Sequence, residues 1–310
     1  MGLTRGRNLL RGRRALSNDA GPATLLVIRH RTWFRETVAR LLMNKGATAA
    51  IVVLVVIAIV VIFAPVFAPY DPIAVDTANT DGPPSLSHPL GTDTIGRDIL
   101  SRIIFGGRLT VLVGVVAIAI AVACGMPLGM IAGYYGSWAD RTISRLMDVM
   151  LAFPGILLAL VVVAVLGSSV LNVTIAVGIS LIPGFVRLVR SSFLTARDQM
   201  YVDAARVIGV SDPRIIVRHI LPNVLAPVMV LATVAMGWAI IIGAALSFLG
   251  LGAQAPTPEW GTDLASGREW IRTAWWMSTF PGVAITIVVI AVNLVGDGLR
   301  DALDPRLRNR

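Results

Sequence analysis

The feature that most limits how this chain can fold is a series of long apolar segments with almost no charged side chains. The first of them, Ala47–Ala68, carries no charge at all. A hydrocarbon core about 30 Å thick is crossed by about 20 helical residues at a rise of about 1.5 Å each. The runs therefore predict an all-α, polytopic membrane protein with about six transmembrane helices. The expected spans are Ala47–Ala68, Leu109–Gly133, Leu146–Leu166, Leu171–Val189, Val224–Leu251 and Phe280–Val295, the last extended backward through 275–279.

Composition supports this prediction, since 55% of the residues are hydrophobic and only 15% are charged, against about 25% charged in a soluble domain. Along the second span, small residues recur every four positions at Gly125, Gly129 and Gly133. Such stripes allow helices to approach closely inside a membrane. Prolines fall within or at the ends of four spans, and several bent, tightly packed helices suit a transporter or a membrane enzyme.

The basic residues predict the orientation, because cytoplasmic loops carry an excess of Lys and Arg. We expect both termini in the cytoplasm, with an Arg-rich cytoplasmic segment at 1–46 followed by a membrane domain at 47–310. The net charge of +9 then follows from topology and requires no nucleic-acid partner. Only five of the 27 Lys and Arg residues lie in the alternate set of segments: Arg97, Arg102, Arg108, Arg268 and Arg272.

Several function classes are disfavoured by what the spans lack. Ion-coupled carriers usually place ionisable residues at mid-membrane depth, and these spans are almost free of them. The sequence has no H-E-x-x-H or G-x-S-x-G motif. The lone cysteine, Cys124, and three scattered histidines form no pattern of metal ligands. We therefore expect no catalytic residue, metal or cofactor in this chain.

The charged segment 191–223, between the fourth and fifth expected spans, is long in a protein with otherwise short loops. It predicts two short helices at an angle. Gly209 is placed to end the first in a left-handed conformation, and Ser211 or Asp212 can cap the second with Pro213 in its first turn. A compact helical projection of this kind is suited to docking a soluble partner.

This segment also carries a specific resemblance. Asp203-Ala204-Ala205, then Gly209, then Ile220-Leu221-Pro222, resemble the "EAA" loop of ABC-importer permeases, with Asp in place of the usual Glu. In that family the short helix before the glycine is the coupling helix, which sits in a groove of the ATPase subunit. The resemblance implies a type I ABC-importer permease fold. The coupling residues expected from it are Tyr201, Asp203, Ala204, Ala205, Arg206, Gly209 and Pro222.

Further strings narrow the family to dipeptide and oligopeptide permeases, with similarity over about residues 40–308. The sequences of the outer loops resemble those of the second, "C-type" permease of the pair, as found in dipeptide and glutathione importers. Many relatives carry an acid where this chain has Gly243. The matching strings are 88–93, 96–98 with 101–102, 147–149 with 153–155, 246–252, 256–261, 280–282 and 293–305.

The resemblance implies a pore-forming permease subunit that imports di- or oligopeptides, including glutathione, across a bacterial inner membrane. The implied partners are a second, different permease, two ABC ATPase subunits that bind ATP and Mg on the cytoplasmic side, and an extracytoplasmic binding protein. The alternatives are the same machinery carrying nickel or another small solute, and an ion-coupled secondary transporter. The tryptophan-containing outer segment 253–277 is expected either to contact the binding protein or to anchor at the membrane interface.

Overall fold

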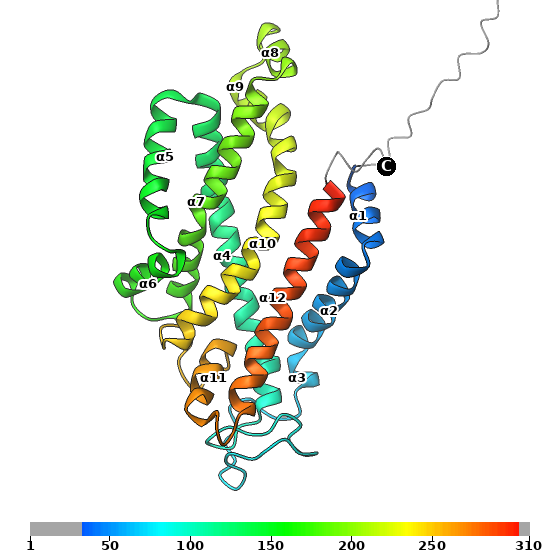
Figure 1. Ribbon diagram of the computed structural model, residues 1–310, viewed down its shortest axis with the longest axis vertical. Helices are drawn as coiled ribbons and strands as arrows, with labels where there is room; N and C mark the ends of the chain where they lie inside the picture. The colour runs from blue at the N-terminus through cyan, green and yellow to red at the C-terminus, as the bar shows by residue number, and fades with distance from the viewer. Residues whose placement is uncertain (1–32, 304–310) are drawn as a thin grey trace, which may run out of the picture.

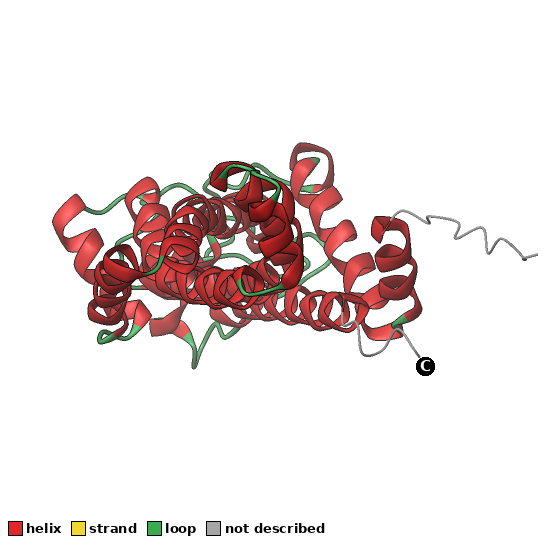
Figure 2. Ribbon diagram, turned by 90° about the horizontal axis from the view of Figure 1, so that it is seen from above, coloured by secondary structure: helices red, strands yellow, loops and turns green. Residues whose placement is uncertain are grey.

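The protein is a bundle of helices in the computed structural model, which describes residues 33–303 (Figure 1). Apart from an isolated bridge between Thr92 and Asp98, these residues form only helices and loops (Figure 2). The prediction of an all-α fold is therefore confirmed. The helices long and apolar enough to cross a membrane are α2 (Lys45–Ile62), α4 (Ile99–Tyr135), α7 (Val170–Arg197), α10 (Leu221–Phe248) and α12 (Trp276–Leu303).

The third expected span, Leu146–Leu166, is not one continuous helix. The chain instead forms α5 (Ser137–Leu151) and α6 (Gly155–Leu166), which meet at 92°. Pro154 lies at the break. Proline has no N–H to donate and disfavours the helical conformation of the residue before it, so the helix is interrupted there. The length of an apolar run in the sequence shows that a span is possible, but it does not show where the helix bends.

The bent pair nevertheless carries the chain back across the bundle. Gly125, Gly129 and Gly133 of α4 meet Phe185, Val189 and Phe193 of α7 in the same order along both helices, so α4 and α7 run parallel. Two parallel neighbours require a return between them, which α5 and α6 provide (Figure 1). With this return the chain makes six passes, as expected.

The small-residue stripe on α4 is confirmed as the contact with α7. A Cβ atom added at Gly125, Gly129 or Gly133 would lie 2.6–2.7 Å from the Cβ of its partner on α7, closer than side chains can pack. Ala117 and Ala121 continue the stripe and are fully buried. Glycine therefore sets the spacing of the two central helices, which is the use that membrane proteins make of small residues.

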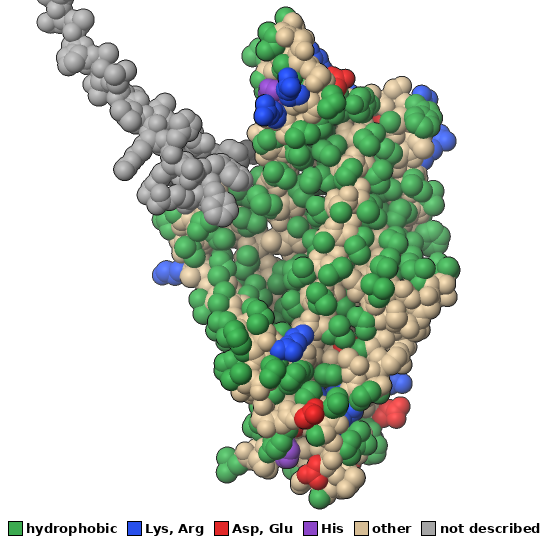
Figure 3. Space-filling model, turned by 180° about the vertical axis from the view of Figure 1, so that it is seen from behind, with side chains coloured by type: hydrophobic (Ala, Val, Ile, Leu, Met, Phe, Trp, Pro, Cys, Tyr) green, Lys and Arg blue, Asp and Glu red, His purple; other side chains and the backbone are tan. Residues whose placement is uncertain are grey.

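The two ends of the bundle are built differently. At one end lie α1 (Trp33–Met43), the end of α12, and α8 (Met200–Val207), which projects furthest (Figure 1). At the other end lie α3 (Ala64–Phe67), the long loop 68–98 and α11 (Trp260–Gly267), which is followed by a 3₁₀ turn at Arg268–Trp270. A broad hydrophobic surface separates the ends on the face shown in Figure 3, and most charged side chains of that face gather toward them.

The second short helix expected in 191–223 is not a separate element. α9 (Asp212–Arg214) continues through a π-helical turn, Ile215–Ile220, directly into α10. Pro222, in the first turn of α10, cannot donate the usual helical hydrogen bond. The neighbouring N–H of Leu221 is instead bonded to the carbonyl of Ile216, five residues back. The wider π turn therefore lets the helix pass through the proline without a break.

Candidate functional site

The projection formed by α8 is the first candidate site, and two inward-facing residues attach it to the bundle. Val202 is completely buried and Ala205 is 5% exposed, and both belong to the apolar cluster that contains Phe193 and Ile215. Gly209 follows the helix with φ of +81°, a conformation that costs glycine little. The predicted glycine stop is confirmed, and it turns the chain from α8 toward α9.

Tyr134, at the end of α4, fastens the projection to the bundle. Its hydroxyl donates a 2.6 Å hydrogen bond to Asp212 Oδ1, and its carbonyl accepts one of 3.2 Å from Arg197. The guanidinium of Arg206 lies over its ring, 5.7 Å from the centroid. Sequence analysis missed Tyr134, because 78 residues separate it from Asp212 and no local pattern connects them.

The outward face of α8 is unusually apolar for the tip of a molecule. Met200, Val207 and Ile208 are 88%, 86% and 79% exposed. Exposed apolar side chains gathered at one place on a surface are typical of an interaction site. Ala204 lies among them, also exposed, and leaves room for a partner to approach the helix backbone.

The remaining predicted coupling residues surround this face. Tyr201 is exposed, and its hydroxyl accepts a 3.3 Å hydrogen bond from Asn223 in the first turn of α10. Asp203 and Arg206 form an exposed ion pair at 3.1 Å, which stabilises α8 little. Pro222 is exposed at the start of α10. The structure thus brings the predicted residues together, on one helix and the helix that it joins.

Ala205 differs from the rest of the predicted set. Its side chain faces this chain's own core, so its small size serves the packing of α8 onto the bundle. Of the two alanines expected among the coupling residues, only Ala204 faces outward. A bulky residue at Ala205 would disturb the projection itself before any partner were met.

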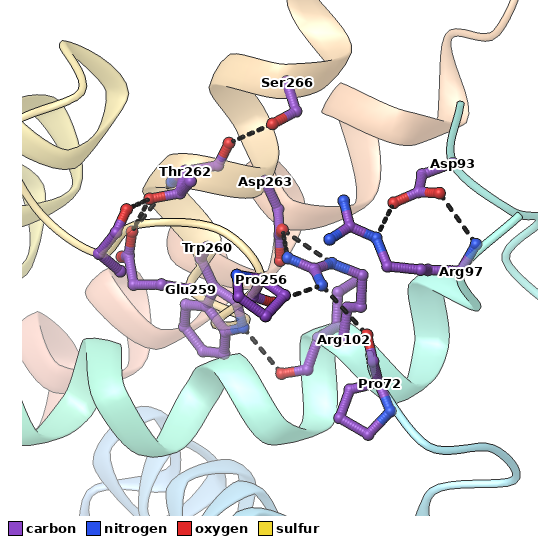
Figure 4. Close-up of polar contacts among 12 residues, drawn as sticks. Pro72, Asp93, Arg97, Arg102, Pro256, Glu259, Trp260, Thr262, Asp263 and Ser266 are labelled. Atoms are coloured by element: carbon purple, nitrogen blue, oxygen red, sulfur yellow. Dashed lines mark hydrogen bonds and ion pairs between the residues drawn. The ribbon is translucent and has the colours of Figure 1, made fainter. Parts of the chain in front are cut away.

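The second candidate site is a buried polar cluster at the opposite end, where α4, α11 and the loop 68–98 meet (Figure 4). Arg102 of α4 forms an ion pair with Asp263 of α11, and its Nη1 donates to the carbonyl oxygens of Pro72 at 3.1 Å and Pro256 at 3.2 Å. Arg102 is 4% exposed. One guanidinium therefore joins α4 to the loop 68–98 and to the segment 256–263. The resemblance had marked Arg102 without giving it this role.

Glu259 and Trp260 complete the junction between α11 and α4. The Glu259 carboxylate caps α11 by accepting hydrogen bonds from the N–H groups of Gly261 at 3.0 Å and Thr262 at 2.9 Å, and Thr110 of α4 donates to it at 3.1 Å. Trp260 is 2% exposed and donates from Nε1 to the carbonyl of Ile103 at 2.8 Å. The string 256–261 therefore forms an internal brace.

The tryptophans of the outer segment fall into two groups. Trp260 and Trp276 are buried, and Trp276 donates from Nε1 to the carbonyl of Thr92 at 3.1 Å. Trp270 and Trp275 are 41% and 49% exposed. The two expected roles, contact with the binding protein or anchoring at the membrane interface, therefore concern Trp270 and Trp275 and not the buried pair.

Burial dominates the electrostatics of the outer cluster. Desolvation raises the pKa of the Asp263 carboxyl from 3.8 to about 6, against the opposing effect of Arg102. Glu259 adds a smaller raising effect, and Arg97 a smaller lowering one. Within residues 33–303, Asp263 Oδ2 is the one buried side-chain oxygen or nitrogen without a hydrogen-bond partner. The ion pair is thus held at an energetic cost that protonation relieves.

Gly243, where the resemblance leads us to expect an acid in many relatives, lies in a tight place. It is buried on α10, and an added Cβ would approach Val113 of α4 to 3.0 Å. A side chain at this position would therefore press on Val113, which would have to shift by a few tenths of an ångström. Over the described part of the chain, no group of three His, Cys, Asp or Glu side chains could hold a metal ion.

A six-pass bundle of bent helices, with an exposed apolar projection at one end and a braced polar cap at the other, defines the class of polytopic membrane proteins. Comparison with known proteins gives the family. The model of the "binding-protein-dependent transport system inner membrane component" matches residues 125–309, and that of the "N-terminal TM domain of oligopeptide transport permease C" matches residues 32–88.

Curated relatives match along most of their length. The chain is 47% identical over 276 residues to the dipeptide transport system permease protein of Alkalihalophilus pseudofirmus, covering 89% of this chain and 91% of the relative. It is 48% identical over 279 residues to the glutathione transport system permease protein of Escherichia coli O157:H7, covering 90% and 92%. The chain therefore belongs to the family of inner-membrane permease components of binding-protein-dependent transport systems.

A solved structure supports the fold. A chain of a methionine ABC transporter in an inward-facing conformation superposes with a TM-score of 0.54 at 17% identity, covering 66% of this chain and 98% of that one. At this identity the match concerns the arrangement of helices alone. It is an ABC-importer arrangement, in agreement with the expected fold class.

Proposed function

We propose that the chain is the C-type, pore-forming permease subunit of an ATP-driven importer of di- and oligopeptides, including glutathione. The observation that carries the proposal is the α8 projection. Its outward face is apolar and exposed, and it is connected through α9 and the π turn to α10, which spans the bundle. A partner that pushes α8 therefore moves a membrane helix directly.

The proposed partner at α8 is an ABC ATPase subunit, one of two beneath a pair of different permeases. These subunits bind ATP and Mg, so this chain needs no cofactor and is not itself an enzyme. A binding protein delivers the solute at the α11 end. Both termini then lie in the cytoplasm on the side of α8, as the excess of arginine there favours, with the Arg-rich segment 1–46 preceding the permease domain. Residues 1–32 lie outside the described part of the chain.

The cargo proposal rests on the relatives. Those with nearly half their residues identical are named for dipeptide and for glutathione transport. Both solutes are short peptides with charged ends, so one class of cargo accounts for both names.

The coupling role is tested by placing tryptophan at Ala204. The side chain there is exposed, so Ala204→Trp should leave insertion and assembly of the membrane domain intact while removing ATP-driven uptake. The matched control is Ala39→Trp, an exposed alanine of α1 at the same end of the molecule. Normal peptide uptake by a correctly inserted Ala204→Trp variant would contradict docking at this face.

The cargo is tested by competition uptake in cells that lack only this chain and in cells where it is restored. The labelled mixture contains dipeptides, longer peptides, glutathione and nickel. Energy-dependent recovery of peptide and glutathione uptake supports the proposal. Recovery of nickel uptake alone would agree with an ATP-driven importer but contradict the proposed peptide cargo. Uptake that survives ATP depletion would contradict the assignment to an ABC importer.

A further inference from the structure

A long apolar groove between α2, α4, α10 and α12 takes no part in the proposed coupling. Its volume is about 720 Å³, within the range of about 300–1,000 Å³ found for small-molecule sites. Arg108 and Thr233 are the polar side chains among its lining residues, and Thr233 is satisfied by the carbonyl of Val230 at 2.8 Å. The rest of the lining is hydrocarbon, so the groove is suited to an apolar occupant.

The groove has the depth of one leaflet. On α4 it extends from Arg108 to Ile118, which is about 15 Å at a rise of about 1.5 Å per residue. A hydrocarbon core is about 30 Å thick, so this is half of it. The apolar part of α4 begins directly after Arg108, which places one end of the groove at the membrane interface and the other near mid-membrane.

Arg108 stands at the interfacial end with part of its guanidinium uncommitted. Its Nε and Nη2 donate to the carbonyl oxygens of Val61 and Ile62, at the end of α2, each at 2.7 Å, and its charge lies over the Phe105 ring. Among the described residues no carboxylate forms an ion pair with it. An exposed cation at this depth, with only neutral partners, attracts a phosphate, to which arginine binds strongly.

We propose that the groove binds one acyl chain of a bilayer phospholipid from the leaflet at the α11 end, with the lipid phosphate on Arg108. The length, the apolar lining and the position of the single cation all match that ligand. A bound chain would fill the space between α2 and the helices α4, α10 and α12. This inference concerns the membrane face and does not depend on which solute is carried.

Ala58→Trp tests the proposal, because Ala58 lines the groove and is exposed toward it. Ala49→Trp is the matched control: Ala49 is also exposed on α2 but lies outside the lining. The transporter is purified in mild detergent, and retained phospholipid is counted by mass spectrometry. We expect the parent chain and Ala49→Trp to retain the same amount, Ala58→Trp to retain one phospholipid fewer per chain, and Arg108→Gln to retain less than the parent.

Equal phospholipid retention by the parent and Ala58→Trp would overturn the proposal. A second measurement does not require the bulky variant to fold. In a Cys124→Ser background, Ala58→Cys is treated with a short bifunctional crosslinker in native membranes. Crosslinking to the second permease would show that a protein helix fills the groove and would also overturn the proposal, whereas labelling by a phospholipid with a thiol-reactive acyl chain supports it.

Discussion

The buried Arg102–Asp263 ion pair predicts that the outer cap becomes more stable as the pH falls toward 4. The carboxyl of Asp263 has a folded-state pKa of about 6, against 3.8 when it is free. A pKa raised by folding means that the folded state binds more protons between these values. The stabilisation is complete below about 3.8 and is lost as the pH rises through about 6.

The magnitude follows from the two pKa values. Each pH unit between them is worth about 1.4 kcal/mol, so the complete effect is about 3 kcal/mol, of which about 2 kcal/mol is gained between pH 7 and pH 4.5. The carboxyl that faces Arg102, Arg97 and Glu259 is the group that titrates. When protonated, Asp263 still accepts a hydrogen bond from Arg102, so the junction is retained.

The assay is thermal unfolding of the purified transporter in detergent at a series of pH values, for the parent and for Asp263→Asn. The asparagine is neutral at every pH, so the stability of this variant should not follow the titration of Asp263. The informative quantity is the difference between the two chains. The parent should gain on the order of 4 °C relative to Asp263→Asn between pH 7 and pH 4.5, and parallel profiles would refute the reasoning.

Three further predictions concern packing and turn geometry. Gly129→Ala should lower the melting temperature by the equivalent of about 1–3 kcal/mol, because its Cβ would lie 2.7 Å from the Cβ of Val189. Gly184→Ala is the control and should leave the melting temperature unchanged, because no atom lies within 4 Å of its Cβ. Equal melting temperatures of the two variants would exclude the α4–α7 contact as the reason for glycine at 129. Gly209→Val should impair ATP-driven uptake because φ is +81°, while Gly209→Asn, which tolerates that conformation, should retain it; the two are compared at equal membrane levels. Arg102→Lys should lower stability despite keeping the charge, because lysine cannot reproduce the forked contacts to Asp263, Pro72 and Pro256; an unchanged melting temperature would show that charge alone suffices.

The sequence by itself determined the membrane character, the six passes, the glycine contact face of α4 and the position of the α8 projection. Each depends on a signal carried by neighbouring residues. A run of apolar side chains of bilayer length, glycines every fourth residue and a glycine stop before a proline are local patterns with direct physical meaning. The family motifs added the identity of the segments, without the contacts that they make.

Only the tertiary structure decided how those segments meet. Tyr134 reaches Asp212, and Arg102 reaches Asp263, across 78 and 161 residues, and no periodicity records such pairs. The 92° bend at Pro154 and the continuous passage through Pro222 show that one residue type gives opposite outcomes. At Pro154 the loss of a hydrogen bond breaks the helix. At Pro222 the wider π turn supplies another backbone hydrogen bond, so the helix continues. Likewise, adjacent Ala204 and Ala205 are equivalent in sequence, but only packing shows that one faces outward and the other the core.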